Sequence, residues 1–199
     1  MAEAIPIEEF REYVRELVRR EVEPRAREAD RQERFPAESF QALAQNDLLG
    51  VNVSPDWGGM GLSNVHYAVM VEEIARGCRA TAVTVAVHTG LVAYMLEAFG
   101  TPEQKERYLP KLVRGEIIGA FALTEPQAGS DAAGIKTRAE ERGDKFILNG
   151  RKVFCTSGSV ADLIIVFAVT DPEKGKRGLS AFLVEKGTPG FSVGKVEEK

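Results

Sequence analysis

The 199-residue sequence contains only two cysteines, Cys78 and Cys155, and only two histidines, His66 and His88. The cysteines lie far apart and form no C-x-x-C pair, which excludes a disulfide framework or a zinc site that spacing could reveal. Two histidines are too few for a histidine-based metal cluster. We therefore expect no metal site and a reducing compartment.

A strong excess of charge of either sign is also lacking, because the net charge is −4 with 28% charged residues. Proteins that bind nucleic acid usually carry a basic patch, so we expect no nucleic-acid partner. No apolar run reaches the length of a bilayer, so no membrane span is expected. The N-terminus alternates Arg with Glu, unlike transit or signal peptides. These features predict a cytoplasmic protein, or a mature form already processed.

The first half of the chain has helical periodicity. In residues 7–23 the apolar side chains share one face, and Pro24 should end or kink this helix. Further helices are expected at 37–47, at 64–76 and at 80–99. The last of these is apolar almost all round, which is typical of a helix buried between neighbours. A short charged helix should follow at 103–108, with Thr101 as N-cap and Pro102 in its first turn, before Pro110.

From about Ile117 the pattern changes to that of strands. Short β-branched or aromatic runs lie between Gly, Asp and Pro turns, at 153–155, 163–169, 179–184 and 191–193. The Asn149-Gly150 pair predicts a two-residue hairpin turn. The sequence thus predicts an α+β chain. Its all-α N-terminal domain would cover residues 1–118, and an antiparallel β-barrel-like domain would cover residues 119–199.

One stretch joins the two halves. An apolar run at 117–123 has the length of a strand and meets Thr-Glu-Pro at 124–126, where proline ends a ladder. A small-residue turn follows at 127–131, in which Gly129 permits a tight backbone. A strand end of this kind exposes N–H groups and hydroxyls that could hold a planar polar ring or a phosphate. An ordinary strand and turn would have the same composition.

Two glycine-rich patterns do not support a nucleotide site. The G-G-x-G at 58–61 follows no clear strand, so a connection between helices is the favoured interpretation. Residues 129–137 nearly spell a phosphate-binding loop, but Ile135 is inserted before Lys136 and displaces its side chain. The residues that follow resemble a strand, where that motif requires a helix. A nucleotide triphosphatase is therefore not expected.

Four segments occur in this order along the chain: SPDWGGMGLS (54–63), GAFALTEPQAGSD (119–131), NGRKVFCTSG (149–158) and TPGF (188–191). With these segments the sequence resembles the acyl-CoA dehydrogenase family over nearly its whole length. The resemblance implies an FAD enzyme that oxidises the Cα–Cβ bond of a short- or medium-chain acyl-CoA to the trans-2-enoyl-CoA. It also implies an electron-transfer flavoprotein as partner, a homotetramer, and a role in β-oxidation of fatty acids. An acyl-CoA oxidase-like flavoenzyme and a non-catalytic flavin or acyl-CoA binding module remain alternatives.

The resemblance also assigns cofactor-binding residues. Thr124 and backbone groups near Leu123 would bond the pyrimidine edge of the flavin. Gly129 and Ser130 would border the pyrophosphate and the thioester ligand, with Ser130 contacting the CoA moiety. Phe121 stands where Tyr is frequent, so a ring-stacking role survives but a hydroxyl role does not.

A second cofactor-binding segment is implied at residues 154–156. The Thr156 hydroxyl would bond near flavin N5, the atom that accepts hydride. Phe154 takes the place of a frequent Trp whose ring shields the flavin. Cys155 lies between them on an expected strand, where inert packing is favoured over a reactive thiol.

In the family, the helix equivalent to 80–99 lines the acyl-chain pocket, which makes Thr84, Val87, His88 and Leu91 candidate substrate-binding residues. Residue type alone favours a satisfied core histidine at His88 instead. The family's catalytic glutamate belongs to a C-terminal helical domain, so we expect it beyond Lys199.

Glu125 lies in the turn motif and is not expected to be the base. No catalytic residue is assigned to this chain. It is expected to be incomplete and inactive alone, since its β domain should continue past the final Glu-Glu-Lys.

Overall fold

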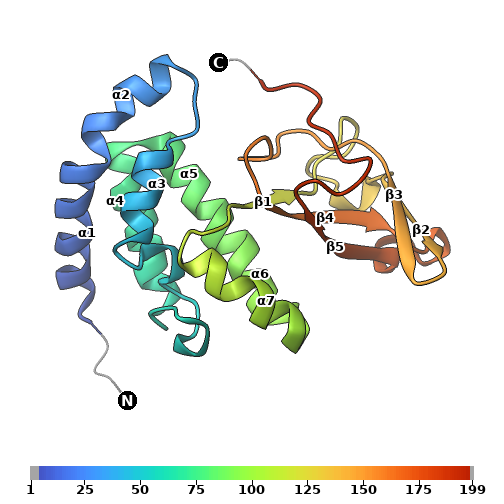
Figure 1. Cartoon of the computed structure of the whole chain (residues 1–199), viewed down its shortest axis with the longest axis horizontal. Helices are drawn as coiled ribbons and strands as arrows, with labels where there is room; N and C mark the ends of the chain where they lie inside the picture. Colours follow the sequence, from blue (N-terminus) through green and yellow to red (C-terminus); the bar gives the residue numbers. More distant parts are fainter. Residues whose placement is uncertain (1–4, 198–199) are drawn as a thin grey trace. The chain divides into compact units, whose positions relative to one another are not determined.

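The structure, a computed structural model, describes residues 5–197. The chain divides into two compact units. Among the described residues, the helical unit comprises 5–119 and 195–197, and the β unit is Ala120–Gly194. Helices come first and the sheet follows, so the predicted α+β class is confirmed (Figure 1).

Within residues 5–197 the helical unit has seven α-helices, and the π-helical segment η3 joins two of them, α5 and α6, into one continuous helix. Their bounds are α1 (Ile7–Glu21), α2 (Glu23–Arg31), α3 (Ala37–Ala44), α4 (Asn64–Gly77), α5 (Arg79–Val85), η3 (Ala86–Ala93), α6 (Tyr94–Phe99) and α7 (Pro102–Val113). Two short 3₁₀ turns, η1 (Leu48–Gly50) and η2 (Pro55–Trp57), lie between α3 and α4.

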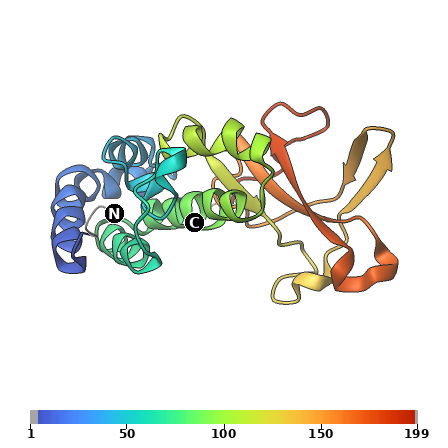
Figure 2. The same ribbon diagram turned by 90° about the horizontal axis from the view of Figure 1, so that it is seen from below.

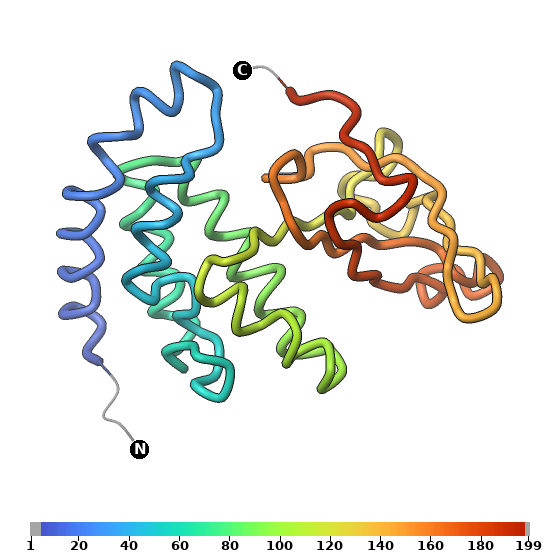
Figure 3. The backbone as a smooth tube through the Cα atoms, in the orientation of Figure 1, coloured from blue at the N-terminus to red at the C-terminus, as the bar shows by residue number. Residues whose placement is uncertain are grey.

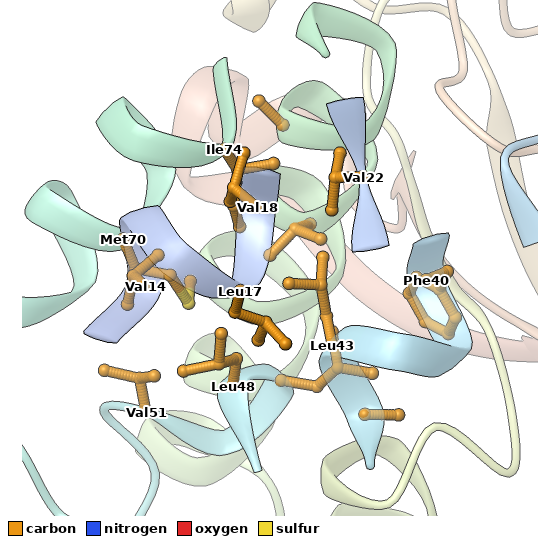
Figure 4. Packing of buried hydrophobic residues seen from close by; sticks show 14 of the residues in the cluster. Val14, Leu17, Val18, Val22, Phe40, Leu43, Leu48, Val51, Met70 and Ile74 are labelled. Atoms are coloured by element: carbon orange, nitrogen blue, oxygen red, sulfur yellow. The ribbon is translucent and has the colours of Figure 1, made fainter. Parts of the chain in front are cut away.

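Helix α1 places its apolar face into the core, as its periodicity predicts. Val14, Leu17 and Val18 are buried and lie against residues of α4 such as Met70 and Ile74 (Figure 4). Burying each such side chain contributes about 1.5–3 kcal/mol relative to leaving it exposed. The expected end of this helix near Pro24 is also confirmed, because α1 stops at Glu21 and α2 begins at Glu23.

The predicted helix at 80–99 is one continuous rod in three parts, α5, η3 and α6 (Figure 3). A π-helical turn spaces its hydrogen bonds five residues apart and frees a carbonyl. Here the Tyr67 hydroxyl donates to the Ala86 carbonyl at 3.1 Å. Gly90 leaves room for that contact, since a Cβ there would lie 2.2 Å from the Tyr67 hydroxyl oxygen.

This rod bears on the expectation that no apolar run reaches the length of a bilayer. The helix Arg79–Phe99 has 21 residues and is long and apolar enough to cross a membrane. The small and polar residues within it hide this property from a search for uninterrupted apolar runs. Helices in the core of a soluble protein meet the same criterion, and nearly half of the most apolar window of this one is buried.

Helix α7 begins as predicted but ends later. The Thr101 hydroxyl accepts from the Gln104 amide and the Gln104 side chain accepts from the Thr101 amide, which completes a capping box. The helix was expected to stop before Pro110, yet it continues to Val113. Leu112 and Val113 are fully buried, and we attribute the extension to this burial, which offsets the hydrogen bond that proline cannot make.

The β unit contains a five-stranded sheet made of β1 (Gly119–Ala122), β2 (Arg138–Arg142), β3 (Lys145–Asn149), β4 (Leu163–Val169) and β5 (Leu179–Glu185). The strand order is β1-β4-β2-β3, with β5 also paired to β4. The β2–β3 and β4–β5 pairs are antiparallel, but β2 meets β4 in parallel at Arg138 and Val169. The sheet is therefore mixed and does not close (Figure 2), which corrects the expected antiparallel barrel-like form.

Three local predictions in this unit were wrong. The β2–β3 hairpin turns at Gly143, whose φ is +65°, and not at Asn149-Gly150, where β3 simply ends. The apolar runs 153–155 and 191–193 are not strands. Phe154 has a φ of +54°, a left-handed conformation that cannot continue an extended strand.

Candidate functional site

The first predicted cofactor stretch follows β1 and closes into a tight turn. The amide of Glu125 donates to the Ala128 carbonyl and the amide of Ala128 donates to the Glu125 carbonyl, both at 3.0 Å. Pro126 lies within this turn and needs no donor there. The turn fixes the course of the backbone immediately after Thr124.

The second predicted stretch, residues 154–156, together with the preceding Lys152 and Val153, lies directly beside the first. The Val153 amide donates to the Thr124 carbonyl at 2.9 Å, and the Cys155 thiol donates to the Phe121 carbonyl at 3.4 Å. These contacts join segments about thirty residues apart in the chain. The structure thus brings together the two segments for which the sequence predicts cofactor binding.

Glu125 is the centre of the polar contacts that hold this turn. Its carboxylate accepts from Lys152 Nζ at 2.8 Å, from the Lys136 amide at 2.7 Å and from the Thr137 amide at 2.9 Å. Gln127 donates a fourth hydrogen bond at 2.7 Å. The residue is 4% exposed, so these four donors compensate a nearly buried charge.

The electrostatics exclude Glu125 as a proton acceptor near neutral pH. Burial alone raises the pKa of its carboxyl. The hydrogen bonds from Lys152 and from the amides of Lys136 and Thr137 outweigh that effect and hold the pKa well below its usual range. A general base needs a pKa close to the working pH, which this carboxylate does not have. Glu125 therefore organises the turn, in agreement with the sequence expectation that it is not the base.

Phe154 combines backbone strain with exposure. A φ of +54° is rare for an aromatic residue and costs of the order of 1–3 kcal/mol. Its side chain is nevertheless 79% exposed within the chain, so packing against the described residues does not compensate the strain. Ser157, three residues later, also has a positive φ of 62°. Strained residues of this kind concentrate at ligand-binding sites.

Two threonines at this edge have hydroxyls that are not used inside the described part of the chain. Neither the Thr124 hydroxyl nor the Thr156 hydroxyl is hydrogen-bonded to another residue between 5 and 197. The Thr124 amide is likewise without a partner among those residues. Both threonines are half-buried. Such groups are available to a ligand that presents hydrogen-bond acceptors.

The predicted glycine and serine also lie in the open. Gly129 and Ser130 are exposed, and a Cβ built on Gly129 would meet nothing within 4 Å. The backbone here has room for a large ligand to approach closely.

The contacts of Phe121 and Cys155 show that both side chains pack within the β unit. The Phe121 ring lies against that of Phe167 in β4, with centroids 5.2 Å apart. Burial raises the pKa of the Cys155 thiol, and its hydrogen bond to the Phe121 carbonyl offsets this only in part. A thiol with a raised pKa is a poor nucleophile, which agrees with the expected packing role.

The four candidate substrate residues of the helical unit fall into two pairs. Val87 is half-buried and Leu91 is 39% exposed, so both retain accessible surface. Thr84 is 5% exposed and His88 is fully buried. His88 Nε2 donates to the Leu112 carbonyl at 2.9 Å, and its Nδ1 accepts from the Gly119 amide at 3.0 Å. His88 thus has the contacts of a core histidine, and only Val87 and Leu91 offer surface to a ligand.

Sequence reasoning missed Lys152. Its side chain is 10% exposed and donates to the Leu123 carbonyl at 3.0 Å as well as to Glu125. One local signal pointed to it. Lys152 lies between Arg151 and the apolar pair Val153-Phe154, where a partly buried segment begins. Nothing local identifies its partner, which is 27 residues away.

The donor set fits a flavin better than a metal. Free N–H and O–H donors beside an exposed aromatic ring suit a planar heterocycle with an acceptor-rich edge. Among residues 5–197 there is no group of three or more His, Cys, Asp or Glu side chains that could hold a metal ion. Thr124, Thr156 and Phe154 are the residues that would hold such a ring.

Comparison with known proteins agrees with this chemistry. Residues 7–116 match the family described as "Acyl-CoA dehydrogenase, N-terminal domain", and residues 120–199 match "Acyl-CoA dehydrogenase, middle domain". The chain belongs to the acyl-CoA dehydrogenase family. The resemblance in the sequence is thereby confirmed, and the family consists of flavoprotein oxidoreductases.

Individual acyl-CoA dehydrogenases are similar over the whole chain. A short-chain-specific acyl-CoA dehydrogenase of Clostridium acetobutylicum is 46% identical, over 95% of this chain and 50% of the relative. The structure of butyryl-CoA dehydrogenase from Megasphaera elsdenii has a TM-score of 0.91 at 36% identity, covering all of this chain and 54% of that one. A Mycobacterium smegmatis glutaryl-CoA dehydrogenase in complex with FADH2 has a TM-score of 0.90 at 32% identity, covering 97% and 48%. The chain thus spans about half the length of these relatives.

Proposed function

We propose that the protein containing this chain is an FAD-dependent acyl-CoA dehydrogenase acting on short- or medium-chain thioesters and passing electrons to an electron-transfer flavoprotein. One observation carries the proposal. Segments 121–130 and 152–156 lie side by side and leave the Thr124 amide and the hydroxyls of Thr124 and Thr156 unpaired among the described residues. The short-chain-specific and butyryl-CoA relatives support the choice of substrate length.

Each part of the edge then has one task. FAD supplies the hydride-accepting chemistry when it is bound. Thr124 would hold the pyrimidine end of the ring through the donors that are unpaired among the described residues, and Thr156 would offer its hydroxyl near the hydride-accepting atom. The exposed Phe154 ring would cover a face of the flavin and exclude water from it. Separately, in the helical unit, Val87 and Leu91 would offer apolar surface to the acyl chain.

The proton acceptor is not assigned to these residues. Glu125 is held ionised by four hydrogen-bond donors and its lowered pKa makes it a weak base. The family resemblance supports a glutamate beyond Lys199. Assembly as a homotetramer and a role in fatty-acid β-oxidation are carried by that resemblance alone, whereas a cytoplasmic location is proposed from the few cysteines and the charged N-terminal sequence.

The proposal is tested on the product of the whole gene, purified with bound or added FAD. Its visible spectrum is recorded before and after anaerobic addition of butyryl-CoA. We expect a yellow protein that bleaches, and that reduces electron-transfer flavoprotein without forming peroxide. Peroxide formation in air would favour the oxidase alternative. Colour without bleaching would favour the binding module, and failure to bind FAD would refute the proposal.

A matched pair of variants tests the assigned edge. Thr156→Val removes the hydroxyl at nearly constant volume, and we expect about hundredfold slower bleaching with FAD retained. Ser159→Ala removes an exposed hydroxyl three residues away, where no contact requires it, and should leave the rate unchanged. Equal rates in the two variants would contradict the role given to Thr156.

A further inference from the structure

Lys152 has an unusual position for an ammonium group. Its side chain is 10% exposed, and it reaches across to the neighbouring segment instead of toward water. Lysine is almost never buried unless it is paired. Here Nζ has two partners, the Glu125 carboxylate at 2.8 Å and the Leu123 carbonyl at 3.0 Å.

Stability alone does not account for this pair. Removing two charges from water costs several kcal/mol per ion, and replacing a buried ion pair by apolar residues is often neutral or stabilising. The Glu125 carboxylate also has two backbone amides and Gln127 as donors, so it does not depend on Lys152 for compensation. Among residues 5–197, the contact that only Lys152 supplies is the one to the Leu123 carbonyl.

The Leu123 carbonyl and the Thr124 amide belong to the same peptide group. An ammonium on the oxygen draws electron density toward it, so the N–H on the other side becomes a stronger donor, as in polarised hydrogen-bond chains. Among residues 5–197 that N–H has no partner. The Thr124 carbonyl is fixed separately by the Val153 amide. The peptide is therefore held and polarised from one side and open on the other.

We propose that Lys152, oriented by Glu125, is a positioning residue that fixes the Leu123–Thr124 peptide and strengthens its N–H as a donor to the acceptor edge of the bound flavin. This inference rests on the proposed function, because it assumes that FAD is the ligand of this edge. A stronger donor at that edge stabilises the negative charge that the ring gains on reduction. Lys152 thereby tightens FAD binding and raises the flavin reduction potential.

The main test compares Lys152→Met with Lys145→Met in the whole protein. Methionine keeps the length of the side chain and removes the charge. Lys145 is an exposed lysine at the start of β3 in the same unit, so its replacement controls for the loss of one positive charge. The measurements are the dissociation constant for FAD added to the apoprotein and the reduction potential of the bound flavin.

We expect Lys152→Met to bind FAD about tenfold or more weakly, as for the loss of one charge-assisted hydrogen bond, and to have a more negative potential. Lys145→Met should match the wild type in both. A purely structural Lys152 would lower the melting temperature while leaving the potential unchanged, and that result would overturn the inference.

Lys152→Gln keeps an N–H donor without the charge, and serves if the methionine variant does not fold. An intermediate potential is expected for it, and a wild-type potential would overturn the role of the charge.

The proposed function and this inference fail in different ways. If the wild type binds no FAD, the proposed function falls and this inference with it. If the wild type binds FAD and all three variants match it, only the inference falls.

Discussion

His88 predicts how the stability of the helical unit depends on pH. The imidazole is fully buried, donates from Nε2 to the Leu112 carbonyl and accepts at Nδ1 from the Gly119 amide. Protonation would place a second N–H against that amide, where no acceptor exists. Burial lowers the pKa of His88 to about 4, although the bond to the Leu112 carbonyl acts in the opposite direction.

The direction of this pH dependence follows from comparing the protonation of His88 in the folded and unfolded chains. An unfolded histidine titrates near pH 6.5, so below that pH the unfolded chain binds a proton that the folded one refuses. The contribution of His88 is fully present above about pH 6.5 and is lost as the pH falls toward about 4. With these two values the free energy of unfolding falls by about 2 kcal/mol between pH 7.5 and pH 5.

The assay is urea unfolding followed by helical circular dichroism across that pH range, for the wild type and for His88→Gln. Glutamine offers one donor and one acceptor but does not titrate. We expect the variant to be less stable at pH 7.5 and the gap to close by about 2 kcal/mol at pH 5. Carboxylates shared by both proteins cancel in this difference. Parallel curves would refute the assigned cause, whatever the stability of the variant.

Three further substitutions test the packing around two glycines and the N-terminal cap of α7. Gly150→Ala places a Cβ 2.2 Å from the Thr137 hydroxyl oxygen, so we expect a loss of about 2 kcal/mol in urea unfolding. Gly129→Ala meets nothing within 4 Å, so its stability should stay within about 0.5 kcal/mol of wild type; a large loss would show that the turn is packed. Thr101→Ala breaks the capping box with Gln104 and should cost about 1 kcal/mol; an unchanged melting temperature would contradict a stabilising cap.

Local patterns in the sequence predict most of the secondary structure. The apolar periodicity at 7–23 and 64–76 gives α1 and α4, because a helix with one apolar stripe has a single face to bury. The run 163–169 coincides with β4 and the run 179–184 with all but the last residue of β5. Each of these signals is local, because it comes from residues in or directly next to the element it predicts.

The errors occur where a distant segment decides the conformation. Asn149-Gly150 has the composition of a hairpin turn, yet Gly150 is required because Thr137 lies against it. Pro110 should end a helix, but the buried Leu112 and Val113 extend α7 past it. The parallel contact between Arg138 and Val169 joins strands on separate hairpins and leaves no local trace.

In the candidate site too, local motifs identify individual residues, whereas contacts between distant segments appear only in the structure. Thr124 and Thr156 could be named from family motifs, but only the structure shows their segments joined and these donors unpaired within the described chain. Backbone bonds take up the Thr124 carbonyl, and the Lys152 ammonium takes up the Leu123 carbonyl. With those acceptors satisfied inside the unit, the edge keeps N–H and O–H donors for a ligand. A cofactor that is rich in acceptors along one edge of a planar ring is the ligand that this asymmetry favours.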